Sequence, residues 1–202
     1  MDADVDLAKR LARDLDGSFE ALVVAHQDRL FTIARRLLGD AHDAEEVAQD
    51  AFVRAYRAIE GYPPERVREL RLRPWLAAIV VNLARNRRRR VADRQPASPL
   101  TPLLENGLDL EDQASARPEA RHATAESRRE WSARLAALPV AYRTAVVLRH
   151  VDGLSYDELA VALGRPEGTV KAQVHRGLRL LRAALDAEAT TDRHSNHTEM
   201  SA

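Results

Sequence analysis

The sequence contains no cysteine among its 202 residues. This absence excludes disulfide bonds, zinc sites built from thiolates and catalytic thiol nucleophiles. Aromatic residues make up only 4% of the chain, although hydrophobic residues as a whole make up 45%. A chain whose cores must come from Ala, Leu and Val suits small helical bundles better than a β-sandwich. The composition therefore predicts an all-α protein.

Long hydrophobic runs and an excess of one charge are also absent. No apolar run approaches the roughly 20 residues that a membrane-spanning helix needs. The N-terminal stretch MDADVDLAKR lacks the apolar segment of a signal peptide. We therefore expect a cytoplasmic protein without membrane insertion. Lys plus Arg and Asp plus Glu both number 31, so the net charge indicates no class of partner.

The distribution of charge along the chain divides it into domains. Residues 82–94 carry six Arg against one Asp, whereas residues 95–126 carry six carboxylates against two Arg. Because the second stretch also holds four prolines and no helical period, we interpret it as an acidic, partly extended linker. It separates an N-terminal helical domain, residues 1–94, from a C-terminal one, residues 127–185. The polar residues 186–202 are predicted to form a disordered tail.

The stretch LSYDELAVALGRPEGTVKAQVHRGLRLLR predicts two short helices joined by a tight turn. Ser155 and Glu158 form a capping-box pattern at the start of the first helix, and Gly164 is suited to end it. One face of the second helix is apolar and can pack against a core; it carries Val170, Val174, Leu178 and Leu181. This arrangement is typical of a helix-turn-helix, whose second helix can enter the DNA major groove.

The opposite face of this second helix presents small and cationic residues outward. Arg176 is suited to a bidentate contact with guanine, and His175 also points to base edges. Lys171 is expected to contact the DNA backbone, and the helix N-terminus favours a phosphate. The predicted DNA-binding residues of this motif are Arg165, Gly168, Thr169, Lys171, Ala172, His175, Arg176 and Arg179. A helical hairpin with a solvated basic face is the alternative for this stretch alone.

A second cationic helix is predicted over residues 73–90. Leu76, Ile79, Val80 and Leu83 follow the spacing of a buried helix face. Four consecutive Arg at 87–90 would repel one another, so they indicate a nearby polyanion such as phosphate. A solvated basic end, favoured by the helix macrodipole, is the alternative. Trp can stack on an unpaired base, and Asn and Arg suit base edges and phosphates. The predicted nucleic-acid-binding residues here are Trp75, Asn82, Arg85, Arg88, Arg89 and Arg90.

An acidic helix is predicted over residues 40–59, after a helix that begins near Phe19 and stops at Gly39. Its inner side carries Val47, Ala51, Ala55 and Ile59. Its outer side carries Asp43, Glu46, Gln49, Asp50 and Val53. An acidic helix face is usually only solvated, but an apolar Val53 among the acids indicates a protein partner.

Two unlike cationic helices in one chain indicate an asymmetric DNA site with two unlike halves. A symmetric repressor needs only one reading helix per subunit. A linker of about thirty residues can extend to roughly 100 Å. That length is enough to join two DNA half-sites some seventeen base pairs apart, a separation of about 60 Å.

Three motifs in this order resemble the extracytoplasmic-function group of bacterial RNA polymerase sigma factors, in the sigma-70 family. DAEEVAQDAFVRAYRAI resembles the helix that docks on the clamp helices of the polymerase β′ subunit. WLAAIVVNLARNRRRR resembles the helix that reads and melts the minus-ten element. ALPVAYRTAVVLRHVDGLSYDELAVALGRPEGTVKAQVHRGLRLLR resembles the region that reads the minus-thirty-five element.

The resemblance implies an alternative sigma factor that directs promoter-specific transcription initiation. Its implied partners are core RNA polymerase, through the β′ clamp helices and the β flap, together with promoter DNA and an anti-sigma factor. The chain departs from the family in three places. Residues 60–74 are longer and more basic than the family's loop, Ala172 stands where Ser is frequent, and Gly177 weakens its helix by about 1 kcal/mol.

Two other classes of protein explain less of the sequence. A stand-alone helix-turn-helix regulator accounts for residues 127–182 but leaves the cationic helix at 73–90 and the acidic face without a role. An enzyme finds little support, because the histidines lack metal-ligand spacing and no Gly-x-Ser-x-Gly turn or Gly-rich phosphate loop occurs. We expect no catalytic residue, no metal and no cofactor.

Overall fold

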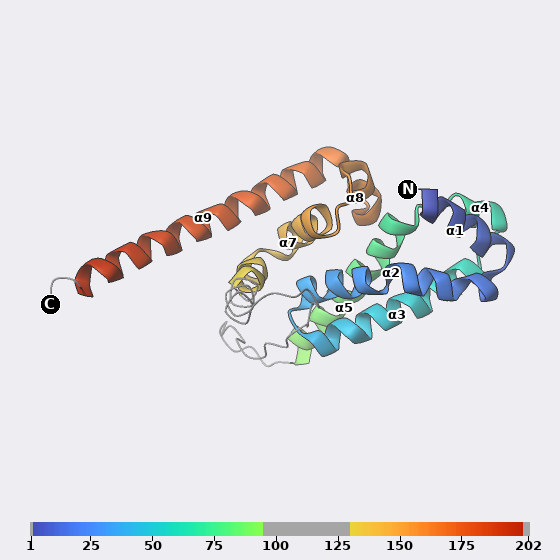
Figure 1. Cartoon of the computed structure of the whole chain (residues 1–202), viewed down its shortest axis with the longest axis horizontal. Coiled ribbons are helices and arrows are strands. Elements are labelled where there is room, and N and C mark those ends of the chain that lie inside the picture. The colour runs from blue at the N-terminus through green and yellow to red at the C-terminus, as the bar shows by residue number, and fades with distance from the viewer. Residues whose placement is uncertain (1, 95–129, 200–202) are drawn as a thin grey trace, which may run out of the picture.

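The computed structural model describes residues 2–94 and 130–199, with side chains for residues 3–90 and 130–186. Across the described ranges the regular secondary structure is helical and no strand occurs, which confirms the all-α prediction. The predicted acidic linker, residues 95–126, lies outside the described residues. Figure 1 shows two groups of helices, one on each side of that gap in the chain.

The N-terminal domain consists of five helices, of which α2, α3 and α5 form a bundle (Figure 1). The helices are α1 (Asp2–Arg13), α2 (Leu15–Leu38), α3 (Ala41–Glu60), α4 (Pro64–Arg68) and α5 (Leu72–Arg94). The caps explain the boundaries. Asp14 accepts the Gly17 N–H at 2.9 Å and begins α2, while Asp40 accepts the Asp43 N–H at 2.8 Å and begins α3. Gly39 ends α2 with φ of +86°, as predicted.

The first helix, α1, was not predicted from the sequence. Its buried side consists of Leu7, Ala8 and Leu11, and it packs against α2 and α4. Residues 60–74, expected to be a loop, contain the short helix α4, which starts at a Pro pair and buries Val67. The basic segment is therefore folded onto the N-terminal domain.

The C-terminal domain begins with a helical segment at residues 130–137, followed by α7 (Val140–Val146) and a π-helical turn, η1 (Val147–Val151). The helix-turn-helix follows as α8 (Tyr156–Leu163) and α9 (Glu167–Glu199). The tail expected to be disordered from Asp186 is instead helical up to Glu199. Neither Gly nor Pro follows Gly177, and Ala, Leu and Glu dominate residues 183–189, so no strong helix breaker ends the helix earlier.

The buried stripe of α9 differs from the predicted one at a single position. Val170, Val174 and Leu181 are buried as expected, but Leu178 is 38% exposed and Gly177 takes its place in the stripe. A Cβ atom at Gly177 would lie 2.6 Å from Cγ2 of Val146 in α7. The missing side chain at Gly177 thus lets α9 approach α7 closely.

The two domains pack against each other. Helix α5 contacts α8, and α2 contacts both η1 and α7. Leu72 of α5 belongs to the same buried cluster as Leu154 and Leu159 of the C-terminal domain. Arg143 adds a polar tie, because its guanidinium donates to the Leu138 carbonyl at 3.1 Å and to the Leu37 carbonyl of α2 at 3.2 Å. Burial, together with nearby Arg88, lowers the pKa of Arg143 to about 10, so this side chain stays charged at neutral pH.

Candidate nucleic-acid and protein-docking surfaces

The helix-turn-helix has the local geometry that the sequence predicts. The Ser155 N–H donates to Oε2 of Glu158 at 2.9 Å, and the Glu158 N–H donates back to the Ser155 hydroxyl at 3.4 Å. Gly164 has φ of +59° and ends α8, so that α9 begins three residues later. These interactions fix the angle at which α9 leaves the turn.

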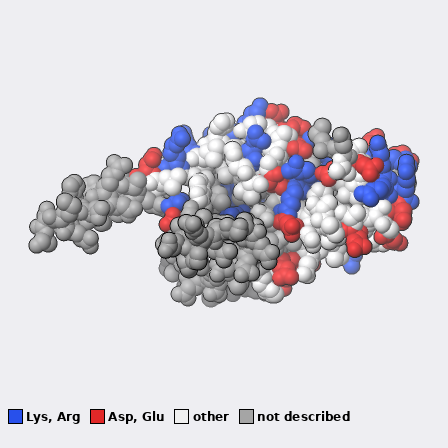
Figure 2. Space-filling view, viewed as in Figure 1, with Lys and Arg blue, Asp and Glu red and all other residues white. Residues whose placement is uncertain are grey.

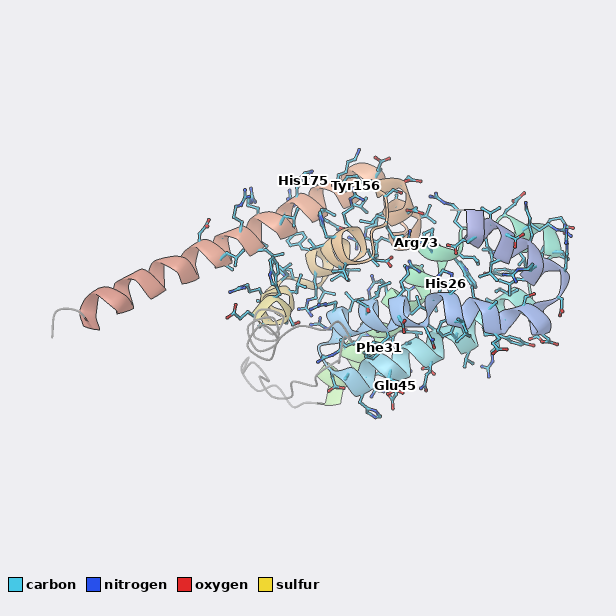
Figure 3. The ribbon with its side chains drawn as sticks, in the orientation of Figure 1. His26, Phe31, Glu45, Arg73, Tyr156 and His175 are labelled. Atoms are coloured by element: carbon cyan, nitrogen blue, oxygen red, sulfur yellow. The ribbon has the colours of Figure 1, made fainter. Side chains whose placement is uncertain are left out.

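The outward face of α9 is free to meet a ligand over its first three turns. All eight residues predicted to bind DNA in this motif are exposed, from Arg165 to Arg179. Figure 3 shows His175 on α9, on the far side of the C-terminal domain from Arg73. In Figure 2 Lys and Arg side chains lie along the same upper edge of the molecule. An exposed cationic face of this kind suits an anionic partner such as DNA.

Two details refine the start of α9. Lys171 contacts Glu167 at 2.6 Å and lies 5.3 Å from the ring of Tyr156. The hydrogen bond to Glu167 raises the pKa of Lys171, which is therefore a positive charge at neutral pH. The Thr169 N–H donates to the Pro166 carbonyl at 3.0 Å, so this N–H is already used within the turn.

The predicted reading face of α5 is likewise exposed. Asn82 and Arg85 lie on the surface and form no side-chain hydrogen bond or ion pair with the described residues. Trp75 is half-buried at one end of this face, with its ring 6.4 Å from that of Tyr62. The guanidinium of Arg66 stacks over the Tyr62 ring at 3.8 Å. No sequence pattern indicates this aromatic and cationic group, although Tyr62 and Arg66 lie in the long basic segment at residues 60–74.

The run of four Arg at the end of α5 does not act as one charged patch. Successive residues point about 100° apart around a helix, so the four side chains leave α5 in different directions. Arg87 binds Glu46 of α3 at 2.7 Å and also hydrogen-bonds Asp43. Arg88 is half-buried and donates to the Leu37 carbonyl at the end of α2 at 3.4 Å. Only Arg89 and Arg90 of the run are exposed.

The acidic face of α3 separates into two parts. Asp43 and Glu46 are half-buried beneath Arg87, and their hydrogen bonds raise the pKa of that guanidinium. Gln49, Asp50 and Val53 are exposed, and Val53 keeps 49% of its surface open. The part of the face that a partner can reach is therefore the second half of the predicted set. Arg87, which is absent from the predicted site residues, holds Asp43 and Glu46 in place by binding both carboxylates.

Within the described residues, no group of three or more His, Asp or Glu side chains is arranged to hold a metal ion. No helix in that part of the chain is both long enough and apolar enough to cross a membrane.

Two family descriptions match the chain. Sigma-70 region 2 matches residues 22–94, and Sigma-70, region 4 matches residues 128–181. The first range contains α3 and α5 with their exposed faces, and the second contains the helix-turn-helix.

Curated relatives extend the match to most of the chain. ECF RNA polymerase sigma factor SigE of Mycolicibacterium smegmatis is 34% identical over 92% of this chain and 66% of its own length. ECF RNA polymerase sigma factor SigW of Bacillus subtilis is 32% identical over 88% of this chain and 94% of its own length. The ECF RNA polymerase sigma-E factor of Escherichia coli is 30% identical over 86% of this chain.

Solved structures show the same fold. CnrH, in complex with the cytosolic domain of CnrY, has a TM-score of 0.65 and 27% identity, and covers 92% of this chain and 98% of that chain. The sigma factor RpoE of Bartonella quintana, in complex with the anti-sigma factor NepR, has a TM-score of 0.58 and 23% identity over 83% of this chain and 96% of that chain. Together with the family matches, these likenesses confirm the resemblance that three sequence motifs indicated. The chain belongs to the extracytoplasmic-function group of RNA polymerase sigma factors, the proteins that direct transcription initiation at specific promoters.

Proposed function

We propose that the exposed faces of α3, α5 and α9 divide the work of initiation between them. Gln49, Asp50 and Val53 of α3 dock on the β′ clamp helices of core RNA polymerase, and the β flap meets the C-terminal domain. Asn82 and Arg85 of α5 read the minus-ten strand, while Arg89 and Arg90 hold its phosphates. His175 and Arg176 of α9 read base edges of the minus-thirty-five element, with Lys171 on the backbone.

The observation that carries this assignment is the pair of exposed cationic helix faces in two domains of one chain. A major groove accepts one helix, and Arg, Asn and His side chains pair with base edges there. The Trp75–Tyr62 pair offers an aromatic surface beside α5 for a base taken out of the stack. The residues 95–126 between the two readers serve as the tether that spans the promoter.

The same proposal covers location and control. The chain acts in the cytoplasm with RNA polymerase, and it supplies positioning and strand separation rather than a catalytic group of its own. CnrH is bound by CnrY and RpoE by NepR in their structures. We expect an anti-sigma factor to hold this chain in the same way.

Run-off transcription on a promoter library tests the assignment. Core polymerase plus the chain should select one family of sequences that core polymerase alone does not select. Asn82→Ala should change the preference within the minus-ten element by about 1–3 kcal/mol, and Arg176→Ala should do so within the minus-thirty-five element. If both variants weaken every promoter equally, the division of labour is wrong. Specific DNA binding without core polymerase would instead support the stand-alone regulator.

A further inference from the structure

Two cationic side chains of the C-terminal domain converge on one aromatic ring. The guanidinium carbon of Arg149, in η1, lies 4.9 Å from the centroid of the Tyr156 ring, and Nζ of Lys171, on α9, lies 5.3 Å from it. Tyr156 is the first residue of α8 and is half-buried. Figure 3 shows Tyr156 at the same edge of the molecule as His175, which belongs to the exposed face of α9. The ring therefore lies at the edge that carries the proposed DNA-reading surface.

The two cations differ in what else holds them. The guanidinium of Arg149 donates from Nη1 to the Leu154 carbonyl at 2.9 Å, and no carboxylate in the described part of the chain pairs with it. A guanidinium has five N–H donors, so Arg149 retains donors for a further acceptor. Lys171 also contacts the Glu167 carboxylate at 2.6 Å. A phosphate that binds Lys171 competes with that carboxylate but does not compete with the Tyr156 ring.

The arrangement leaves positive charge available to an anion. Both cations lie within about 10 Å of each other, roughly the Debye length at 0.1 M salt, so they repel each other. An aromatic face attracts cations through its quadrupole but carries no net charge, so it holds both without neutralising either. In a helix-turn-helix, the helix before the recognition helix crosses the DNA backbone. The anion expected at the start of α8 is therefore a DNA phosphate.

We propose that Tyr156 is a positioning residue that holds Arg149 and Lys171 toward the DNA backbone beside the minus-thirty-five element. The ring restricts the directions that two long side chains can take, so less conformational freedom is lost when they bind phosphate. The ring, and not the hydroxyl group, carries this role. The inference rests on the proposed function for the identity of the DNA, and it adds Arg149 and Tyr156 to the predicted DNA-binding surface.

Contact between Lys171 and the ring can be measured in the free, full-length chain. The sequence contains only two lysines, Lys9 and Lys171, so isotope-labelled lysine gives two sets of side-chain NMR signals. Shielding by the ring should move the ε-methylene signals of Lys171 upfield of those of Lys9. The shift should persist in Tyr156→Phe and disappear in Tyr156→Leu. Lys171 signals that Tyr156→Leu leaves unchanged would overturn the positioning role.

Binding of promoter DNA separates the ring from the hydroxyl group. The probe is a labelled duplex with the minus-thirty-five element selected from the promoter library, titrated with holoenzyme and followed by fluorescence anisotropy. Tyr156→Leu keeps an apolar side chain at this half-buried position and should weaken binding by about two- to fivefold for each cation released. Tyr156→Phe should bind like the parent chain. An equal loss in both variants would assign the effect to the hydroxyl group and overturn the proposal.

A double-mutant cycle identifies the cations through which Tyr156 acts. In an Arg149→Gln/Lys171→Gln background, Tyr156→Leu should have no further effect, because no charge remains for the ring to position. Arg179→Gln is the matched control background, since Arg179 is an exposed cation of the same helix as Lys171. There Tyr156→Leu should weaken binding as much as in the parent chain. Equal losses in both backgrounds would show that Tyr156 acts only through the folding of its domain.

The parent holoenzyme distinguishes failure of this inference from failure of the proposed function. It should prefer the selected duplex to one with a scrambled minus-thirty-five element. Absence of that preference would contradict the proposed function. If the preference is present and Tyr156→Leu binds as tightly as the parent chain, the positioning role alone is wrong. The NMR shifts do not depend on DNA and test the contact between Lys171 and the ring in either case.

Discussion

Gly177 shows how one absent side chain sets the spacing of two helices. Its Cβ position lies 2.6 Å from Val146 Cγ2 and 3.4 Å from Tyr142, both in α7. Overpacking of this kind costs about 1–3 kcal/mol, more than the roughly 1 kcal/mol gained when Ala replaces a helical Gly. We therefore predict that Gly177→Ala lowers the free energy of unfolding, measured by urea denaturation.

Gly168 of the same helix supplies the control. No atom lies within 4 Å of its Cβ position. Gly168→Ala should leave stability unchanged or raise it by up to about 1 kcal/mol. Equal destabilisation by both substitutions would show that helix propensity and not the contact with α7 decides the effect.

His26 makes stability depend on pH. It is 4% exposed, and burial lowers its pKa; Asp4 opposes the shift, while Arg29 and Arg73 add to it. Below the unfolded pKa of about 6.5 the unfolded chain binds a proton that the folded chain does not. Stability therefore falls as pH decreases below that value, by at most about 1.4 kcal/mol per pH unit. Urea denaturation between pH 5 and 8 should show this decrease in the parent chain and in His42→Gln, but not in His26→Gln.

At the residue scale the sequence predicts exposure better than it predicts partners. The spacing of Val170, Val174 and Leu181 was sufficient to place the outward face of α9, because helix periodicity alone decides it. The same spacing predicted that Leu178, and not Gly177, lies in the buried stripe of α9. Hydrophobicity carries no information about how closely two helices approach, so the role of Gly177 was missed. Partners such as Glu46 for Arg87 depend on tertiary packing, which no local pattern contains.

Among the elements, α3 carries the prediction for polymerase docking. Asp50 is exposed beside Val53, whereas Glu46 is occupied by Arg87. Asp50→Arg should therefore weaken binding to core polymerase on the order of tenfold or more, since it reverses a charge at the proposed contact. Fluorescence titration of labelled chain with core polymerase measures this affinity.

Glu60→Arg is the matched control for that experiment. Glu60 is exposed at the far end of the same helix, about 15 Å from Asp50. Its reversal should leave the affinity for core polymerase unchanged. A loss of similar size in both variants would indicate a general electrostatic attraction in place of a docking site.

Helix boundaries could be predicted from the sequence where local capping residues specify them. The helix-turn-helix was predictable because Ser155, Glu158 and Gly164 specify its caps chemically. Helix α1 was missed although Leu7, Ala8 and Leu11 share one face, because the charged residues among its twelve positions make it resemble a polar terminus. The extension of α9 past Asp186 was missed because a polar composition was interpreted as disorder, whereas helix propensity depends on backbone preference.

At the scale of the whole molecule, the fold class and the order of the functional surfaces were predictable, but the packing of the two domains was not. Arg29 and Asp152 are 123 residues apart in sequence, and neither lies in a motif. The acidic stretch at 95–126 led to the expectation of two domains joined by an extended linker, which says nothing of contacts between them. A charge pair between two domains, such as Arg29 and Asp152, arises only in the complete fold. Sequence patterns that describe one helix at a time therefore cannot reveal it.

The division of the Arg run on α5 has a thermodynamic consequence for promoter binding. Each phosphate that a protein neutralises releases counterions, so log K falls with log salt by about 0.7–0.9 per contact. Arg89→Ala and Arg90→Ala should each reduce the slope by roughly that amount, because both side chains are exposed. Arg87→Ala and Arg88→Ala should leave the slope unchanged, because Arg87 neutralises α3 and Arg88 binds a carbonyl. Fluorescence anisotropy of holoenzyme on promoter DNA across a salt series measures the four slopes. Four equal changes would indicate that all four Arg contact DNA phosphates. By this division we expect two of the four Arg at 87–90 to release no counterions when the holoenzyme binds promoter DNA.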